Sequence, residues 1–543
     1  MQAKQVFSLI NLSLFIIFFF TGCSERITPV ERANKEQILL KANGADPATL
    51  DPQLATGVIE FDILLSLFEG LMKPNPVTLD PEPAVAESYE ASEDGKRYTF
   101  FFRKDALWSN GDPITAHDFE FSYKRILSPN LGSQYAYMLY PILNASKFNQ
   151  GEIDDFAEVG VKAIDDHTLQ IDLESPTPYF LSLILHLSWY PVHPPTILKH
   201  GEMDELGTRW TRPGNMVSNG PFALKKWSVN DDLVVTRNTN YWDNDAVALN
   251  GIHFLPIENL NTEERAFRAG QVHITKSIPL SKVDSYRASG SKDLRINPYL
   301  GIYYYTINTT RPPLDNIEVR KALSMAIDRK LITEKILKGG QLPALHFTPP
   351  NTGGYTTEYN VQENVEEAQK LLADAGFPGG KNFPVIELLY NSSESHKLIA
   401  EAIQQMWKKN LGIDVSLINQ DWKVYLNSRR QKDYDIARAS WIGDFVDPIN
   451  FLDLMASYSG NNHTGWASLE FDELLDEASR TSDPEKRFTI LQEAEAMALK
   501  EMPVIPIYFY MSVYLVNPAV EGWHANILDW HPYQAISLKN EAN

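Results

Sequence analysis

The sequence predicts an α/β fold built from more than one domain. At 543 residues the chain exceeds what a single hydrophobic core supports, so we expect two or three domains. The clearest α/β pattern is a strand over Val385–Tyr390, an amphipathic helix over Glu394–Asn410 that ends before Gly412, and a strand over Asp414–Ile418. The short connections between these elements predict a right-handed crossover between parallel strands.

The first 22 residues have the pattern of a signal peptide. Lys4 is their only charge, and it precedes a run rich in Leu, Ile and Phe that ends at Phe20. This run is short for a membrane span. The segment Phe20–Cys23 resembles a bacterial lipobox, and Cys23 is the only cysteine, so no disulfide forms within one molecule. We expect lipidation of Cys23, which would anchor the chain to a membrane in the periplasm or at the cell surface; the alternative is plain secretory cleavage.

In the N-terminal half, strands are expected where β-formers gather between turn residues. Thr115–Asp118 fits a capping box at the start of a helix, and Asn110-Gly111 predicts a turn just before it. The elements expected here are strands over Ile38–Leu40, Tyr98–Arg103 and Asp165–Leu173, and helices over Phe61–Leu71 and Phe119–Ile126.

In the C-terminal half, glycines and capping residues delimit the helices. Asp315 or Asn316 can cap a helix that lies within Pro312–Arg329, and Asp483-Pro484 starts a helix that runs to about Lys500. The other expected elements are helices over Glu263–Gly270 and Val361–Ala375, and strands over Val272–Ile274, Tyr299–Asn308 and Ile505–Val516.

Composition and motifs argue against most enzyme classes. The net charge of −21 disfavours nucleic acid and anionic membrane surfaces as partners. The sequence contains no H-E-x-x-H, G-x-S-x-G or G-x-G-x-x-G motif, and no cysteine besides Cys23. We therefore predict a protein without catalytic activity, cofactor or metal. A hydrolase that uses paired carboxylates stays open, because acidic residues are abundant.

One stretch combines a strand with two opposite charges. Within Asp433–Leu452, Arg438 and Asp444 are six positions apart, so on an extended chain both side chains point to one face, at most about 20 Å apart. The backbone of Ser440, Trp441 and Ile442 between them could pair with an added strand. A cation and an anion that bracket a free strand edge suit a short zwitterionic peptide; the alternative is two solvated surface charges.

Several strings identify a family. The runs FRKDALWSNGDPITAHDFEFSYKRI (102–126), PGNMVSNGPFALKKW (213–227) and PPLDNIEVRKALSMAIDR (312–329) resemble the solute-binding proteins of peptide and nickel ABC importers. The resemblance implies a periplasmic-binding-protein-like α/β fold (class II, cluster C) with two lobes, a hinge and an extra domain. It implies a discontinuous lobe I (24–69, 194–295 and 512–543), an extra domain II (70–193) and a lobe III (296–511).

The oligopeptide-binding branch of that family matches this chain residue by residue. The resemblance implies that Asp444 pairs with the α-ammonium of the peptide and Arg438 with its carboxylate. The peptide would lie as an added strand between Thr56-Gly57-Val58 and Ser440-Trp441-Ile442. The implied pocket walls are Tyr135, Tyr299, Tyr304, Asn391, Trp422, Arg429 and Tyr510, and His396 matches a histidine that can help to bind the carboxylate.

At one position the chain departs from this branch. A lysine that meets the carboxylate of shorter peptides is replaced by Leu337, with Lys338 adjacent. Either Lys338 takes over this contact, or the preferred peptide length differs.

The resemblance implies an extracytoplasmic oligopeptide-binding component of an ABC importer. Such a monomer binds peptides of about two to five residues by their backbone and termini, largely independent of sequence, and delivers them to permease and ATPase subunits in the membrane. A murein-peptide or signalling-peptide receptor of the same fold is the alternative, and an extracellular hydrolase is a further one.

Overall fold

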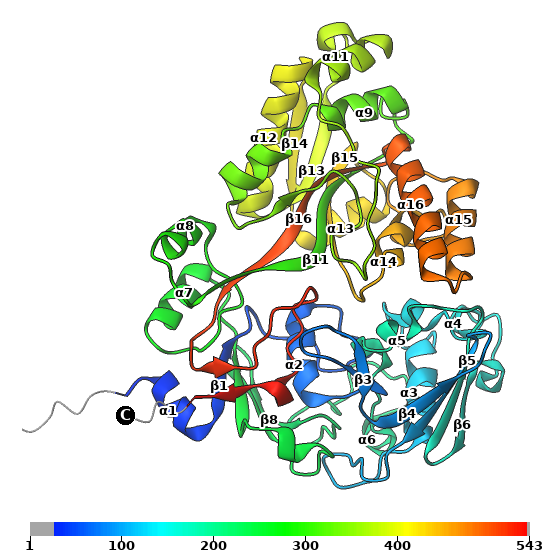
Figure 1. The fold of residues 1–543 in the computed structure, drawn as a ribbon, viewed down its shortest axis with the longest axis vertical. Helices are drawn as coiled ribbons and strands as arrows, with labels where there is room; N and C mark the ends of the chain where they lie inside the picture. The colour runs from blue at the N-terminus through cyan, green and yellow to red at the C-terminus, as the bar shows by residue number, and fades with distance from the viewer. Residues whose placement is uncertain (1–26, 540–543) are drawn as a thin grey trace, which may run out of the picture.

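The computed structural model describes residues 27–539, and it forms an upper and a lower lobe (Figure 1). The expected signal peptide, the lipobox and Cys23 lie outside the described residues. Within 27–539, no helix is both long and apolar enough to span a bilayer.

The upper lobe contains a six-stranded mixed sheet in the order β12-β16-β11-β15-β13-β14. The crossover predicted from the sequence is confirmed, because β13 and β14 pair in parallel and α12 connects them. The strands of this sheet are β11 (Leu294–Ile307), β12 (Leu342–Pro343), β13 (Ile386–Asn391), β14 (Val415–Gln420), β15 (Ile436–Ile442) and β16 (Val504–Leu515).

The lower lobe contains two four-stranded sheets, in the orders β1-β10-β9-β8 and β4-β5-β7-β6. Two-stranded ribbons, β2-β3 and β17-β18, complete it. The strands are β1 (Ile38–Ala42), β2 (Met72–Pro74), β3 (Pro81–Pro83), β4 (Ala86–Ala91), β5 (Arg97–Phe102), β6 (Val161–Asp165), β7 (Thr168–Asp172), β8 (Phe222–Ser228), β9 (Asp232–Arg237), β10 (Gly251–Leu255), β17 (Val520–Glu521) and β18 (Ser537–Leu538).

Helices cover the sheets of both lobes. Those of the N-terminal half are α1 (Pro29–Glu36), α2 (Val58–Leu67), α3 (Ala116–Leu127), α4 (Ala145–Asn149), α5 (Phe180–Leu183), α6 (Pro194–His200), α7 (Leu260–Arg268) and α8 (Leu280–Ala288). Those of the C-terminal half are α9 (Ile317–Met325), α10 (Arg329–Leu331), α11 (Val365–Asp374), α12 (Glu394–Leu411), α13 (Trp422–Arg430), α14 (Ile449–Leu452), α15 (Leu469–Ser479) and α16 (Pro484–Glu501).

The long strands β11 and β16 connect the lobes. They run side by side from the upper lobe toward α7, α8 and β1 (Figure 1). Their antiparallel register is interrupted between Pro298 and Ile302, where the two strands pass from one lobe to the other. An interruption of the ladder leaves fewer backbone bonds to resist bending, so the connection can act as a hinge at this point.

Capping residues mark helix starts as the sequence indicated. Thr115 forms a capping box with Asp118, Asn316 caps α9, and Asp483 caps α16 with Pro484 in its first turn. In each case a side-chain oxygen accepts a backbone N–H that the first helical turn leaves unpaired.

Four predicted elements were wrong in extent or type. The helix expected over Val361–Ala375 starts only at Val365, and the strand expected over Asp165–Leu173 is limited to β7, because residues 166–167 form a turn. The helix expected over Phe61–Leu71 is α2, which ends at Leu67 because Phe68 is extended (φ −129°, ψ 158°). Gly220 lies against the backbone at that point, where an added Cβ would be 2.6 Å from the Phe68 nitrogen, so this approach requires glycine. The strand expected over Val272–Ile274 is reduced to isolated bridges at Ile274, which lies between β1 and the end of β16.

Candidate functional site

The strand β15 has a free edge along its second half. On one side β11 pairs with it from Ile436 to Ile442, but on the other β13 pairs only with Ile436 and Ala437. The Gly443 N–H donates to the Leu300 carbonyl, and hydrogen-bonded positions alternate along an antiparallel pair. Ser440 and Ile442 therefore direct their backbone groups away from β11, toward the free edge.

Arg438 lies at one end of this edge with its side chain almost fully buried. Its guanidinium donates to Asn391 Oδ1 (3.3 Å), Ser440 Oγ (2.9 Å) and Tyr510 Oη (3.2 Å). The guanidinium carbon is 4.9 Å from the centre of the Tyr303 ring, a cation–π distance. Among residues 27–539, its Nε has no hydrogen-bond partner. Neutral groups therefore surround the Arg438 guanidinium, and its Nε–H remains available to donate a hydrogen bond to a ligand.

Asp444 lies beyond the other end of the edge, two residues after β15. Its carboxylate accepts from Tyr135 Oη (3.1 Å) and Tyr137 Oη (3.4 Å), and its side chain is 11% exposed. Asn450 Oδ1 accepts both the Asp444 backbone N–H (3.2 Å) and the Trp441 indole N–H (2.9 Å). The loop after β15 is therefore anchored to the start of α14.

Neither charge is neutralised by a protein group. Over residues 27–539, no carboxylate forms an ion pair with Arg438, and the one basic side chain near Asp444 is His186, 4.0 Å away. Burial lowers the pKa of His186 to about 3, so this ring is neutral at physiological pH. Burial likewise raises the pKa of Asp444 to about 7, although the tyrosine and Asn450 hydrogen bonds oppose the shift. A cation placed beside Asp444 would restore its ordinary acidity.

The Asp444 region is also where the lobes meet. Tyr135 and Tyr137 lie at η1 (Ala136–Leu139) of the lower lobe, whereas Asp444 belongs to the upper lobe. Next to it, Tyr179 stacks on Phe445 with ring centres 5.3 Å apart and planes within 9°. On this side the lobes are in direct contact.

The structure brings part of the predicted set together. Ser440, Asn391 and Tyr510 contact Arg438 directly, and Tyr135 contacts Asp444. His396 lies near the Arg438 end, 5.6 Å from the Tyr303 ring centre. Its pKa is lowered to about 3 by burial and by the Arg438 charge, so it is neutral and can only donate or accept a hydrogen bond.

Three other residues predicted as pocket walls do not contact the charged groups, and their role as walls stays a prediction. Tyr304 is on the opposite face of β11 from Tyr303, and its ring packs edge-on against Phe347 at 4.9 Å. Trp422, which is 53% exposed, and Arg429 both pack on Tyr425 of α13, whose hydroxyl donates to the Arg438 carbonyl. These three side chains have no direct contact with either charge among the contacts of the described chain.

The lower-lobe segment of the predicted site is only partly extended. Gly57 is extended (φ −109°, ψ 150°) and Thr56 before it is exposed, but Val58 is the first residue of α2. An added strand can therefore follow Thr56 and Gly57, whereas Val58 offers only the N–H of a first helical turn, and its contact with a peptide stays a prediction. Tyr299 lies within the interrupted part of β11 and is half-buried.

Four residues at the two charges were not predicted from the sequence. They are Tyr303 at Arg438, and Tyr137, His186 and Asn450 at Asp444. Period-two alternation could have identified Tyr303, because a residue paired with Ser440 in β11 shares the face of Arg438. Tyr137 and His186 come from distant segments whose approach to Asp444 no local pattern reveals, whereas Asn450 lies six positions after Asp444 in the same stretch.

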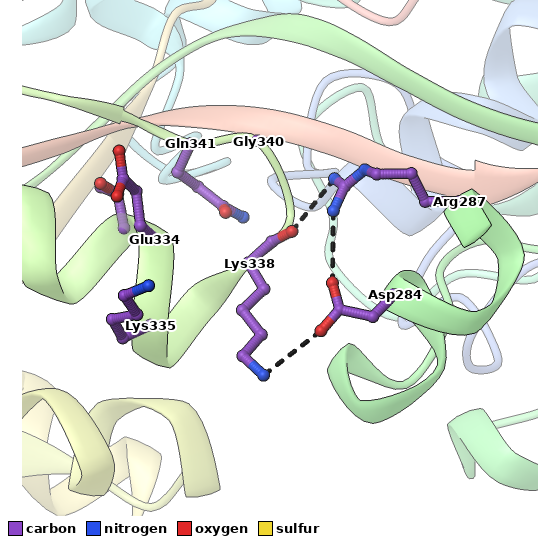
Figure 2. A pocket seen from close by; sticks show the side chains of 8 residues that line it. Asp284, Arg287, Glu334, Lys335, Lys338, Gly340 and Gln341 are labelled. Atoms are coloured by element: carbon purple, nitrogen blue, oxygen red, sulfur yellow. Dashed lines mark hydrogen bonds and ion pairs between the residues drawn. The ribbon is translucent and has the colours of Figure 1, made fainter.

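Lys338 forms its ion pair with Asp284 (Figure 2) and contacts neither Arg438 nor Asp444. Its ammonium contacts Asp284 Oδ2 of α8 at 3.2 Å, and Leu337 is buried. As for metals, residues 27–539 contain no cluster of three or more His, Cys, Asp or Glu side chains that could hold an ion.

Comparisons with known proteins match most of this chain. A family model described as bacterial extracellular solute-binding proteins, family 5 Middle, matches residues 80–463. The periplasmic oligopeptide-binding protein OppA of Salmonella typhimurium is 39% identical over 520 residues, which cover 94% of this chain and 93% of that protein.

Solved structures show the same architecture. OppA of Haemophilus influenzae, in complex with the peptide RPPGFSPFR, has a TM-score of 0.81 and 34% identity, covering 93% of this chain and 99% of that one. The murein tripeptide binding protein MppA of Escherichia coli has a TM-score of 0.82 and 36% identity, covering 92% and 98%. Against the unliganded open form of MppA the score falls to 0.75, with 93% and 98% covered. The lobes of this chain are thus arranged less like those of the open form.

Proposed function

Because the chain belongs to the family 5 bacterial extracellular solute-binding proteins, we propose that it binds short peptides outside the cytoplasm for an ABC importer. Members of this family are binding proteins and not enzymes. A catalytic role, which the abundance of carboxylates had left open, is therefore excluded for this chain.

The pair Arg438 and Asp444 carries the proposal. Arg438 is buried and the Asp444 side chain is 11% exposed; neither has a countercharge from the described residues, and one lies at each end of a free strand edge. Leaving a charge buried without a partner is costly, so a structure that maintains two such charges favours a ligand that neutralises both. A zwitterionic peptide does so, with its α-ammonium at Asp444 and its carboxylate at Arg438, where a guanidinium suits two carboxylate oxygens.

Backbone pairing would make the binding largely independent of sequence. The peptide adds as a strand to Ser440 and Ile442 on one side and to Thr56 and Gly57 on the other, through groups that every peptide has. An extended chain advances about 3.3 Å per residue, so peptides of about two to five residues fit along the edge between the two charges, which are at most about 20 Å apart. Because Lys338 is bonded to Asp284, we propose that Arg438 takes the carboxylate, assisted by a hydrogen bond from His396.

The domain division supports capture by closure. We propose lobe I (24–69, 194–295 and 512–543), domain II (70–193) and lobe III (296–511), with β11 and β16 as the two hinge strands. Each of the three larger sheets falls almost wholly within one of these units. Closing the lobes would bring Tyr135 and Tyr137 onto Asp444 and enclose the amine end of the peptide.

The remaining partners follow from this role. The closed, loaded monomer delivers its peptide to permease subunits driven by ATPases, while a lipid on Cys23 would keep it at the membrane.

Titration of the purified protein with tetra-alanine, by calorimetry, tests the proposal. We expect saturable one-to-one binding, which is lost when the peptide is both N-acetylated and C-amidated. Mass spectrometry of molecules released on denaturing the freshly purified protein should find short linear peptides. If neither experiment finds a bound peptide, the proposal fails.

A second candidate is a murein peptide, favoured by the likeness to MppA, a murein tripeptide binding protein. Competition of murein tripeptide against tetra-alanine separates the two. Arg438 and Asp444 suit an ordinary peptide with both termini free, so we expect tetra-alanine to bind more tightly.

A further inference from the structure

One aromatic side chain of the lower lobe packs between two residues of the upper lobe. Tyr179 immediately precedes α5, which lies below α14 and α16 in Figure 1. Its ring stacks on Phe445 with ring centres 5.3 Å apart, and the guanidinium carbon of Arg487 lies 5.2 Å from the centre of the same ring. We call Phe445 and Arg487 the Tyr179 socket. Tyr179 thus contacts an apolar and a cationic group of the opposite lobe at once.

The Tyr179 socket is held in place by contacts within the upper lobe. Arg487 of α16 donates from both of its terminal nitrogens to Asp447, each at 2.7 Å, and both side chains are buried. Asp447 also accepts the backbone N–H of Ile449 at the start of α14 (3.0 Å). A bidentate pair of this kind fixes the planar guanidinium in one orientation. The surface that receives Tyr179 therefore does not depend on the lower lobe for its shape.

Tyr179 itself is fixed to the lower lobe. The next residue, Phe180, packs edge-on against Trp189 with ring centres 5.6 Å apart, and both are buried. This domain is in turn tied to the rest of the lower lobe, because Arg125 of α3 donates to both carboxylate oxygens of Asp51 (3.1 and 2.7 Å) and both side chains are buried. Asp51 belongs to the proposed lobe I and Arg125 to domain II, so the two units move together.

Opening of the lobes has to separate Tyr179 from its socket. The ring contacts Phe445 directly, and the two residues are anchored in different lobes, which the strands β11 and β16 connect. Bending of these strands at their interruption moves the lower lobe away from α14 and α16. Ring stacking and cation–π attraction both act only within about 6–7 Å, so a small opening already removes both contacts.

We propose that Tyr179 is a lobe-positioning residue, whose ring stabilises the closed arrangement and has to leave the socket of Phe445 and Arg487 before a bound peptide is released. A ring stack and a cation–π contact that are both lost on opening correspond to about a five- to fiftyfold change in affinity. Because the contact forms after the peptide has entered the open cleft, it slows release and leaves the association rate nearly unchanged. The affinity readout rests on the proposed function, whereas the arrangement of the lobes does not.

The main test compares Tyr179→Ala with Tyr179→Phe as the matched control. Phenylalanine keeps the ring, and within residues 27–539 the Tyr179 hydroxyl forms no hydrogen bond, so this control should behave like the wild type. Phe445→Leu removes the other half of the stack, and the double variant Tyr179→Ala/Phe445→Leu completes a cycle. Calorimetry gives the dissociation constant for tetra-alanine, and stopped-flow displacement of a labelled peptide gives the dissociation rate.

Tyr179→Ala should raise the dissociation constant and the dissociation rate about five- to fiftyfold, whereas Tyr179→Phe should stay within about twofold of the wild type. Phe445→Leu removes part of the same contact, so the double variant should be little worse than Tyr179→Ala alone. The proposal is overturned if Tyr179→Ala shows no loss, if Tyr179→Phe loses as much, if the losses in the cycle are additive, or if only the association rate changes.

A second experiment needs no peptide. In a Cys23→Ser background, Tyr179→Cys and Phe445→Cys place two cysteines across the contact between the lobes, and a short bis-maleimide joins them. Small-angle X-ray scattering of the crosslinked protein gives the radius of gyration of the closed lobes, and ligand-free Tyr179→Ala should have a larger one. A pair that does not crosslink, or an equal radius, overturns the proposal. If wild-type protein binds no tetra-alanine, the proposed function fails, and crosslinking and scattering alone decide on Tyr179.

Discussion

Replacing Asp444 by asparagine removes the negative charge at the proposed amine site while keeping the shape of the side chain. Asparagine can still accept from Tyr135 or Tyr137 and leaves the Asn450 contact to the backbone intact. The variant should therefore fold, and a change in peptide affinity reports on the charge.

The magnitude follows from burial and the lack of a countercharge. The Asp444 side chain is 11% exposed, and its neighbour His186 is neutral, so the peptide ammonium would be its only cationic partner. Breaking a buried charge pair by removing one partner costs about 2–5 kcal/mol. A loss of about 3 kcal/mol corresponds to a roughly 150-fold rise in the dissociation constant.

Calorimetry at pH 8 with tetra-alanine and N-acetyl-tetra-alanine completes a double-mutant cycle. Acetylation removes the ammonium, so wild-type protein should lose about as much affinity as the Asp444→Asn variant does, and the two changes together should cost little more than either alone. Additive losses, or a loss of less than about fivefold for either change, would refute the pairing of Asp444 with the amine.

The pH profile provides an independent check. Only ionised Asp444 attracts the ammonium, and burial raises its pKa to about 7. The wild-type dissociation constant should therefore rise about tenfold for each pH unit below pH 6, and again above pH 9, where the free peptide amine loses its proton. In Asp444→Asn the acid limb near pH 7 should disappear; if it persists, another group governs the profile.

Three further outcomes follow from the same contacts. Arg438→Gln should weaken tetra-alanine binding by about 2–4 kcal/mol and make the protein indifferent to C-terminal amidation; a variant that still distinguishes acid from amide would contradict this role. Asn450→Leu removes the acceptor of both the Trp441 indole and the Asp444 N–H, so the preference for a free amine over an acetylated one should shrink by about 1–3 kcal/mol, and Trp441 fluorescence should shift; an unchanged preference would contradict it. Because the pKa of Asp444 is raised by burial from 3.8 to about 7, the stability that its carboxyl contributes is fully present below pH 3.8 and lost as the pH rises through 7. Asp444→Asn should therefore increase the free energy of unfolding of ligand-free protein at pH 8 by up to about 4 kcal/mol, and have little effect near pH 4. Calorimetric scans at the two pH values check this, because the melting temperature should rise only at pH 8.

Local patterns predicted much of the fold. The crossover of β13, α12 and β14 follows from hydrophobic periodicity and from Gly412, and the caps at Thr115 and Asp483 depend on atoms within one helical turn. Such features need no knowledge of the rest of the chain. Where the packing of a distant segment determines the end of a helix, the prediction was wrong. The helix α2 ends at Leu67, where Gly220 lies against its backbone.

For the site, the sequence by itself determined the chemistry at its centre. Arg438 and Asp444, the strand between them and the family strings together predict a ligand with two opposite charges and a backbone to pair. Arg438, Asp444 and the strand are contiguous in the chain, so residue type and spacing brought them together as a candidate, and the resemblance carried by strings elsewhere in the chain was needed to favour a ligand over two solvated surface charges.

Only the tertiary structure decided which side chains surround those charges. Tyr137 and His186 come to Asp444 from more than 250 positions away in the chain, across the contact between the lobes. The strand parity that turns Tyr303 toward Arg438 turns Tyr304 away, and the fold brings Lys338 to Asp284. Burial then makes Arg438 and Asp444 a binding site. A charge on a solvated strand has little desolvation cost, but a buried charge without a partner has a large one, which a ligand of opposite charge offsets.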